Sequence, residues 1–498
     1  MHRLATASRS LSVALTLVLG ACSSGDKTGE SGGEIAKGTY APSRTTAIKG
    51  VDANLVRTEI GRLVTTGRPE WMTDHQWLHT KQTYKLYNNS PLWLEKEGAG
   101  RRVKSLATAL TASHGDGLRL DAYPLAEITT ALTALKEDKQ TPEALAQTDM
   151  LLTQAYIALA EDMLTGQVDP RSVTQSWNID VHEDQLDSAF VRTVRAENIE
   201  EALSSMRPRD DDYVFLQAEL DRYRELVVKG GWGTVPAGKA VAPGAKDSPA
   251  RIAALRARLA AEGIVLAAAP AAGGVYDGAL AGAVATWQSM HGIGVDSMLG
   301  VETLEALNRP AAYRLGQIAA NLERLRWMPR SLGLRYLVVN VPAFRVEGYE
   351  DGKKAIEMKV IVGADFTDRA TPVFSDTMTH VVFRPYWNVT DDIANKELWP
   401  KIRANSGYME ANDYETFQES GKTRIRQRPG PKNSLGLVKF MFPNAYNIYL
   451  HDTPNQKLFQ EDVRAFSHGC IRLEKPAELA QWLLKWDAAK VQAAMAPS

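Results

Sequence analysis

The chain has 498 residues, too many for one hydrophobic core, so we expect about three domains. Hydrophobic residues make up 44% of it and charged residues 23%, proportions that are ordinary for a folded globular protein. The formal net charge of −1 excludes a global field that would attract nucleic acid or an acidic membrane. No internal apolar run has the length of a membrane span.

Residues 1–21 have the pattern of a secretory signal, with a basic start, an apolar stretch and small residues at the end. The run Leu19-Gly20-Ala21-Cys22 resembles a bacterial lipobox. That resemblance implies cleavage before Cys22 and lipidation of its thiol, which anchors the protein to a membrane without spanning it. Ser23 in place of an aspartate favours the outer membrane, so we expect a periplasmic, lipid-anchored protein. The alternative is a plain secretory signal that leaves Cys22 as a free thiol.

Residues 22–48 are rich in Ser, Gly, Thr and Lys and have few large apolar side chains, which predicts a flexible tether. Residues 49–235 follow a mainly helical pattern. A helical spacing of apolar residues, closed by Gly166, is clear at Leu152, Tyr156, Leu159 and Met163. We therefore expect a helical domain after the tether.

Residues 250–309 form a compact segment with Asp-Gly turns and the pair Trp287-Gln288. It closes with Gly300-Val301-Glu302-Thr303, and the order of these features resembles the small three-helix peptidoglycan-binding domain. The resemblance implies glycan binding, although a three-helix bundle that only spaces other domains fits the same residues. Residues 310–334 predict one more helix that returns the chain to the helical domain.

Beyond residue 334 the period changes from helices to strands. Apolar runs on either side of Asp351-Gly352 predict a hairpin with positive φ at its turn. Further runs, of which the last leads into His451, predict a mostly β-sandwich domain over residues 335–491. A long polar insertion, residues 392–433, interrupts these strands and is rich in Lys and Arg. Such an insertion fits either a basic lid for a carboxylate-bearing ligand or a solvated surface loop.

Chemistry concentrates near the end of the chain. His451-Asp452-Thr453-Pro454 follows the last long strand, and Ser467-His468-Gly469-Cys470-Ile471-Arg472 comes shortly after it. A thiol becomes a good nucleophile once a base or a positive field ionises it, and two histidines offer that base. Gly469 permits a tight turn whose N–H groups can face a developing oxyanion. The residue types alone also fit a buried, inert cysteine with two ordinary histidines.

The full pattern resembles the signature of the L,D-transpeptidase (YkuD-type) catalytic domain. In the helical region before it lie the runs Tyr87-Asn88-Asn89-Ser90-Pro91-Leu92-Trp93 and Gly117-Leu118-Arg119-Leu120-Asp121-Ala122-Tyr123. Both resemble the scaffold of the long, YcbB-like members of that family. By this resemblance Cys470 is the nucleophile, His451 its base, and the Asp452 carbonyl orients the imidazole. The remaining implied site residues are His468 and Gly469 at the oxyanion, and Arg472, Ser467, Trp387 and Tyr386 on the substrate.

The resemblance implies a multidomain α+β protein that forms 3→3 cross-links in peptidoglycan through a cysteine thioester, without a metal or organic cofactor. Its partners are then stem peptides and glycan, with carbapenems as inhibitors and the insertion at residues 392–433 as a cap over the site. Two other functions remain open. One is a cysteine peptidase or carboxypeptidase, in which water takes the same thioester, and the other is a non-catalytic lipoprotein that binds the wall.

Overall fold

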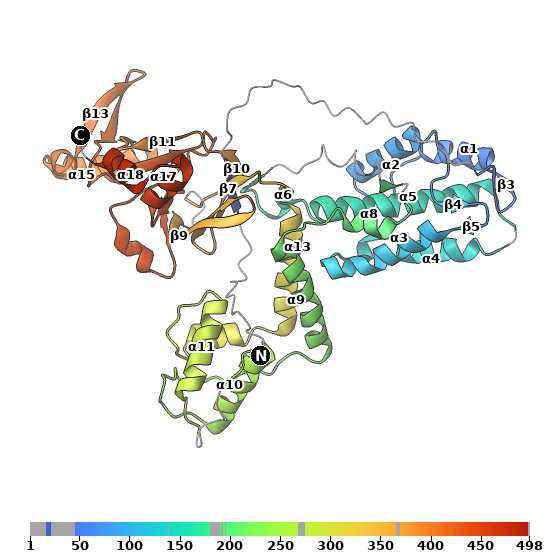
Figure 1. Ribbon diagram of the computed structural model, residues 1–498, viewed down its shortest axis with the longest axis horizontal. Helices are drawn as coiled ribbons and strands as arrows, with labels where there is room; N and C mark the ends of the chain where they lie inside the picture. Colours follow the sequence, from blue (N-terminus) through green and yellow to red (C-terminus); the bar gives the residue numbers. More distant parts are fainter. Residues whose placement is uncertain are drawn as a thin grey trace.

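The computed structural model describes residues 16–20, 45–137, 139–179, 190, 193–194, 196–266, 274–364 and 369–496. It is a mixed α+β structure with a helical region, a small helical bundle and a sheet-rich region (Figure 1). The multidomain α+β architecture expected from the sequence is confirmed. In the part of the chain that the structure describes, every helix falls short of what crossing a lipid bilayer requires.

The helical region is built around α5, the longest helix in it. Thr141 caps the start of α5 by accepting from the Ala144 N–H, and Gly166 ends it with φ of 91°. The predicted spacing in this helix is confirmed, because its apolar residues are buried in the core of the region. Its helices are α1 (Ala53–Leu63), α2 (Asp74–Leu86), α3 (Arg101–Ala112), α4 (Leu125–Ala134), α5 (Pro142–Thr165), α6 (Pro170–Val173) and α8 (Ile199–Ser204), with 3₁₀ turns η1 (Ser113–Asp116) and η2 (Leu120–Ala122). Its short hairpins are β2 (Ala47–Ile48) with β3 (Val51–Asp52), and β4 (Leu94–Glu95) with β5 (Gly98–Ala99).

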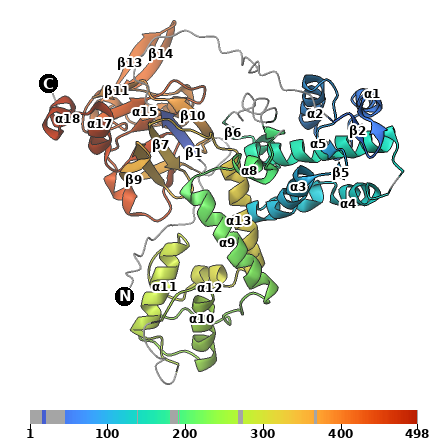
Figure 2. The same cartoon turned by 45° about the vertical axis from the view of Figure 1, so that its right-hand side comes forward.

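Two long helices, α9 (Asp211–Val228) and α13 (Ala311–Arg326), pack side by side between the helical region and the sheet (Figures 1 and 2). Helix α13 is the returning helix expected at residues 310–334. At its end Arg326 is only 1% exposed. Its guanidinium donates to the Asp116 carbonyl at 2.8 Å and to the Tyr213 hydroxyl at 2.9 Å. The returning chain is therefore tied to both α9 and the helical region.

The segment between these two helices forms a separate three-helix bundle of α10 (Pro249–Ala261), α11 (Gly278–Met290) and α12 (Val301–Leu307). Ser248 and Asp277 cap the first two helices. The bundle has its own core, which includes the fully buried Trp287. The three helices expected here are present, and glycan binding by them stays a prediction.

The sheet-rich region is one continuous path of hydrogen-bonded strands in the order β11-β15-β16-β18-β9-β8-β7-β1-β10-β6, with β17 also paired to β9. The expected turn at Asp351 and Gly352 is confirmed, with φ of 50° and 74°. Strand β9 pairs with β8 along most of its length and with β18 near its end, so it joins the two halves of the path. The strands are β6 (Trp177–Asn178), β7 (Arg335–Asn340), β8 (Arg345–Glu350), β9 (Lys353–Gly363), β10 (Val373–Thr377), β11 (His380–Phe383), β15 (Val438–Met441), β16 (Leu450–His451), β17 (Ala465–Ser467) and β18 (Ile471–Leu473), followed by α17 (Pro476–Leu484) and α18 (Ala488–Met495) and, within the loops, η4 (Gln456–Gln460).

Part of the predicted signal segment takes a place in this sheet. Strand β1 (Thr16–Gly20) pairs antiparallel with β7 and parallel with β10. We expected the N-terminus to stand apart from the fold, and the apolar, strand-favouring residues of this segment explain its pairing. Cys22 and the tether lie outside the described residues, so cleavage and lipidation stay predictions. A chain cleaved before Cys22 would lack β1.

The insertion after β12 (Trp387–Asn388) is a folded subdomain. It contains α14 (Asp391–Ile393), a π-helical turn η3 (Ala394–Leu398), α15 (Trp399–Ala404), α16 (Tyr408–Ala411), β13 (Tyr414–Glu419) and β14 (Lys422–Gln427). Its three strands form a separate sheet in the order β12-β14-β13, over a small core of its own. The β13–β14 hairpin projects from the rest of the region (Figure 2). The insertion is therefore not a loose polar loop.

Replacing Arg326 by Met removes the tie between α13, α9 and the helical region. The change leaves the buried Asp116 carbonyl and Tyr213 hydroxyl without their charged donor, so we expect a loss of about 3 kcal/mol in stability. Hydrogen–deuterium exchange of α9 and α13 peptides, together with thermal unfolding, measures it. Arg324→Met on the same helix is the matched control, because among the described residues the Arg324 side chain donates to the nearby Asn321. Equal protection in the two variants would contradict the assigned role.

Candidate active site

The site is organised by the register of three neighbouring strands. Lys439 of β15 pairs with His451 of β16, and His451 pairs with Arg472 of β18. Just before these pairs, the Ile471 N–H donates to the Tyr449 carbonyl at 3.1 Å. Because β16 and β18 run parallel, this contact sets Tyr449 beside the residue that precedes Ile471.

That residue is Cys470. Side chains alternate between the two faces of a sheet, so residues two apart on one strand share a face. Tyr449 and His451 therefore share a face with Cys470 and Arg472. The intervening Leu450 and Ile471 are fully buried in the core behind them. The topology thus collects a thiol, an imidazole, a phenol and two cations on one surface of three strands.

The turn before β18 holds Cys470 in place. Gly469 has φ of +111°, and a Cβ there would lie 2.9 Å from Ile448 Cδ1. The Ser467 hydroxyl accepts from the Gly469 N–H at 3.1 Å and donates to the Cys470 carbonyl at 2.5 Å. The Thr371 hydroxyl donates to the Gly469 carbonyl at 2.8 Å from across the sheet. Hydrogen bonds from the Ser467 and Thr371 side chains therefore fix the conformation of the turn.

His451 is 3% exposed and is held by the backbone. Its Nδ1 lies 2.5 Å from the Asp452 carbonyl oxygen, the contact expected from the sequence. A carbonyl only accepts, so Nδ1 carries the proton and Nε2 is the basic nitrogen. The Asp452 carboxylate in turn accepts from the N–H groups of Leu437 and Thr453 at 2.8 and 2.7 Å, which fixes the residue that orients the ring.

Burial lowers the pKa of His451 to about 3, and the Arg472 guanidinium adds to this effect. The Asp452 and Leu435 carbonyls favour the protonated ring but are outweighed. His451 is therefore neutral at physiological pH. It is a weak base in this environment, and a negative charge beside the ring would raise its pKa.

Cys470 is half-buried, and its Sγ lies 3.7 Å from the Asn447 carbonyl oxygen. Burial raises the pKa of the thiol, whereas Tyr449, Lys439 and Arg472 favour the thiolate. Between these two described residues, Cys470 and His451, no direct hydrogen bond forms. Their places on adjacent strands set their Cα atoms ~8 Å apart, for a strand spacing of ~4.8 Å and a rise of ~3.3 Å per residue. Catalytic hydrogen bonds are often formed only once substrate is bound.

Two of the predicted site residues, His468 and Ser467, form contacts with other groups of the protein. His468 is exposed, and its Nε2 lies 2.8 Å from Glu397 Oε1 in the insertion. The same carboxylate oxygen lies 3.7 Å from the Arg369 guanidinium. His468 thus faces the insertion. Ser467 is 3% exposed, and its hydroxyl is used within the turn described above.

The two aromatic residues predicted for substrate lie at the start of the insertion. Trp387 packs on the core of the insertion and contacts the Tyr449 side chain. Tyr386 is exposed, with the Arg426 guanidinium 4.3 Å from its ring centre. Trp387 therefore contacts Tyr449, which lies on the same face as Cys470, whereas Tyr386 packs against Arg426 of the insertion.

Sequence reasoning missed Lys439, Tyr449 and Glu397. Lys439 interrupts the otherwise apolar run Val438–Phe442, and that interruption was the available signal. Lys439 comes close to the site only through the antiparallel pairing of β15 with β16, which cannot be read from the sequence. Glu397 had no signal of its own, because the insertion carries many acidic residues.

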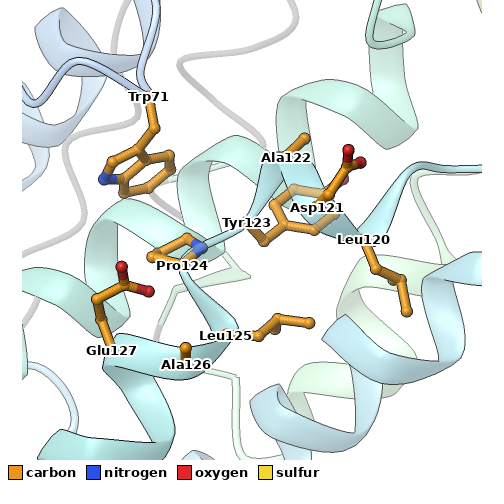
Figure 3. A pocket seen from close by; sticks show the side chains of 9 residues that line it. All are labelled: Trp71, Leu120, Asp121, Ala122, Tyr123, Pro124, Leu125, Ala126 and Glu127. Atoms are coloured by element: carbon orange, nitrogen blue, oxygen red, sulfur yellow. The ribbon is translucent and has the colours of Figure 1, made fainter.

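A hollow of about 480 Å³ lies far from these strands, in the helical region. Trp71 and the segment 120–127 line it, and the indole of Trp71 lies across from Pro124 (Figure 3). No thiol or imidazole lines this hollow, so we assign the candidate active site from the chemistry on the three strands.

The pKa shifts predict how the thiol reacts. Since burial raises the thiol pKa, Cys470 is mostly protonated at pH 7, and alkylation by iodoacetamide should speed up with pH well beyond pH 8. Mass spectrometry of the Cys470 peptide measures the rate, and Cys22 in the same sample is the internal reference where its thiol is free. A rate already at its plateau at pH 7 would mean a preformed thiolate and contradict this assignment.

The comparison with known proteins agrees with the geometry. Residues 334–492 match the family model of the L,D-transpeptidase catalytic domain (YkuD), and residues 79–220 match a scaffold domain model. A Haemophilus influenzae protein named "Putative L,D-transpeptidase" is 36% identical over 186 residues. That alignment covers 34% of this chain and 37% of the relative, so it spans little more than a third of the relative's length. The chain therefore contains, in residues 334–492, a domain that matches the L,D-transpeptidase (YkuD) catalytic domain, preceded by a region that matches a scaffold domain.

Proposed function

We propose that this protein is an L,D-transpeptidase that joins peptidoglycan stem peptides through a thioester on Cys470. The observation that carries the proposal is the strand register that sets Cys470 and a neutral, backbone-anchored His451 on one face of adjacent strands. The family of the C-terminal domain supports the same reaction.

In the first half-reaction the Cys470 sulfur attacks the carbonyl of the third stem residue, an L-centre. His451 Nε2 takes the thiol proton and passes it to the amine of the departing D-alanine. For this transfer the thiol turns from the Asn447 carbonyl toward the imidazole as substrate binds. In the second half-reaction a side-chain amine of another stem attacks the thioester, which releases the thiol and forms a 3→3 cross-link. Two modest barriers replace one high one.

The oxyanion needs N–H donors, and the turn limits which are free. The Gly469 N–H is bound by Ser467, and the Ile471 N–H by Tyr449. Among the described groups of this turn, the Cys470 N–H has no such partner, so we assign it as the backbone donor. One donor of this kind is typically worth about 3 kcal/mol in the transition state.

We also propose where the reaction takes place. The signal pattern and Cys22 support a lipid anchor that holds the protein in the periplasm, on the outer membrane. The three-helix bundle at residues 250–309 would then bind glycan beside the site. Hydrolysis of the thioester by water, as in a carboxypeptidase, uses the same residues and differs only in the acceptor.

Product analysis with defined tetrapeptide stems tests the proposal. The protein should give cross-linked dimers, and Cys470→Ala should lower their rate by at least about 10³-fold, because the covalent step is lost. Cys22→Ser is the matched control and should keep full activity in detergent solution. Shortened monomers in place of dimers would mean that the protein is a carboxypeptidase. An active Cys470→Ala variant would mean that the thiol is not the nucleophile.

Carbapenems should acylate the same thiol. Ring opening by the Cys470 sulfur forms a thioester and adds the mass of one intact drug molecule, which intact-mass spectrometry followed by peptide mapping detects. His451→Ala should slow the adduct, since the base that receives the thiol proton is gone. Absence of an adduct on a free Cys470 thiol would count against the site as described.

A further inference from the structure

Two cations flank the thiol on the face formed by β15, β16 and β18. Arg472 of β18 lies two residues after Cys470. Lys439 of β15 lies two strands from Arg472, and His451 of β16 pairs with both residues. Both side chains are half-buried. The Lys439 Nζ lies 3.6 Å from the ring centre of Tyr449, whose side chain contacts the sulfur. Lys439 therefore reaches over the phenol toward Cys470.

Neither cation has a carboxylate partner among the residues that the structure describes. The basic insertion is different, because its cations are largely matched by its own acidic groups. Examples are Lys396 with Asp392 at 2.7 Å, Arg424 with Glu419 at 3.0 Å and Arg426 with Glu415 at 2.6 Å. A half-buried ammonium without a counter-ion is costly, so its retention at this position calls for an anion.

We propose that the Lys439 ammonium is an electrostatic partner of Cys470 that stabilises the thiolate formed during acyl transfer. It acts through the nucleophile and is a positioning residue. Its importance for cross-linking rests on the proposed function, whereas its effect on the sulfur does not.

The other groups around the sulfur are consistent with this role. His451 is neutral, so it adds no charge of its own before the proton moves. Tyr449 offers its side chain and backbone N–H to the sulfur. His468, next to the turn, faces Glu397, whose carboxylate also lies near Arg369. The carboxylate of Asp452, the residue after His451, accepts from the backbone N–H groups of Leu437 and Thr453.

The electrostatic interactions of the two cations are consistent with this proposal. Burial lowers the pKa of both Lys439 and Arg472, and the negative charge of the Cys470 thiolate raises it. A nearby positive charge lowers the pKa of an acid. Without Lys439 the pKa of the Cys470 thiol should therefore rise.

The experiment is the pH profile of Cys470 alkylation by iodoacetamide, in the full chain and without stem peptides. Lys439→Met should move the profile upward by about one pH unit and slow alkylation about tenfold at pH 7 to 8. Lys439→Arg should restore it, since the charge returns. Lys490→Met is the matched control, because Lys490 also lies over an aromatic ring, Trp486, at 4.0 Å but on α18. It should leave the profile unchanged.

An unchanged profile in Lys439→Met would overturn the proposal. Circular dichroism of each variant checks folding, and Lys439→Gln, which keeps a polar side chain, replaces Lys439→Met if that variant does not fold. Because the assay reads only the thiol, its outcome is separate from that of the proposed function. If the protein makes no dimers but Lys439→Met shifts the alkylation profile, the transpeptidase assignment fails and the role of Lys439 stands. If the protein makes dimers but the profile does not shift, the role of Lys439 fails and the transpeptidase assignment stands.

Discussion

The register of β15, β16 and β18 is the constraint on which the candidate site depends. A slip of one residue in any of these strands would turn its side chains to the opposite face, because the side-chain period of a strand is two. Leu450 and Ile471 prevent such a slip, since they would leave the core if the register changed. The hydrophobic core thus fixes where His451 and Cys470 point.

Within that register, burial and charge act in opposite directions on the same thiol. Burial alone would keep the sulfur protonated and inert, as in many structural cysteines. The two cations and Tyr449 offset part of that penalty without ionising the thiol outright. In the proposed mechanism, the neutral His451 completes the ionisation by accepting the thiol proton at the moment of attack. Because most of the thiol is protonated at neutral pH, such a site should react slowly with small electrophiles there.

Much of this organisation could be predicted from the sequence. The motif around Cys470 and His451 identified the nucleophile candidate, and the Asp452 carbonyl contact was expected from the same motif. Helices α5 and α13 were predicted from the helical spacing of their apolar residues, and the turn at Gly352 from its Asp-Gly sequence. Lys439 and Glu397 could not be found in this way, because their meaning comes from pairings between segments far apart in the chain. The internal ion pairs of the insertion were hidden for the same reason.

The insertion changes the account of substrate charge. A basic lid would attract the carboxylates of a stem peptide, but Lys396, Arg424 and Arg426 already have acidic partners. Among the described residues, its hydrogen-bonding contact with the motif comes from an acidic group, Glu397, which faces His468. That contact joins the insertion to the residue before Gly469, in the turn that carries Cys470. The positive charge available at the site comes instead from Lys439 and Arg472, on the rigid strands beside the sulfur.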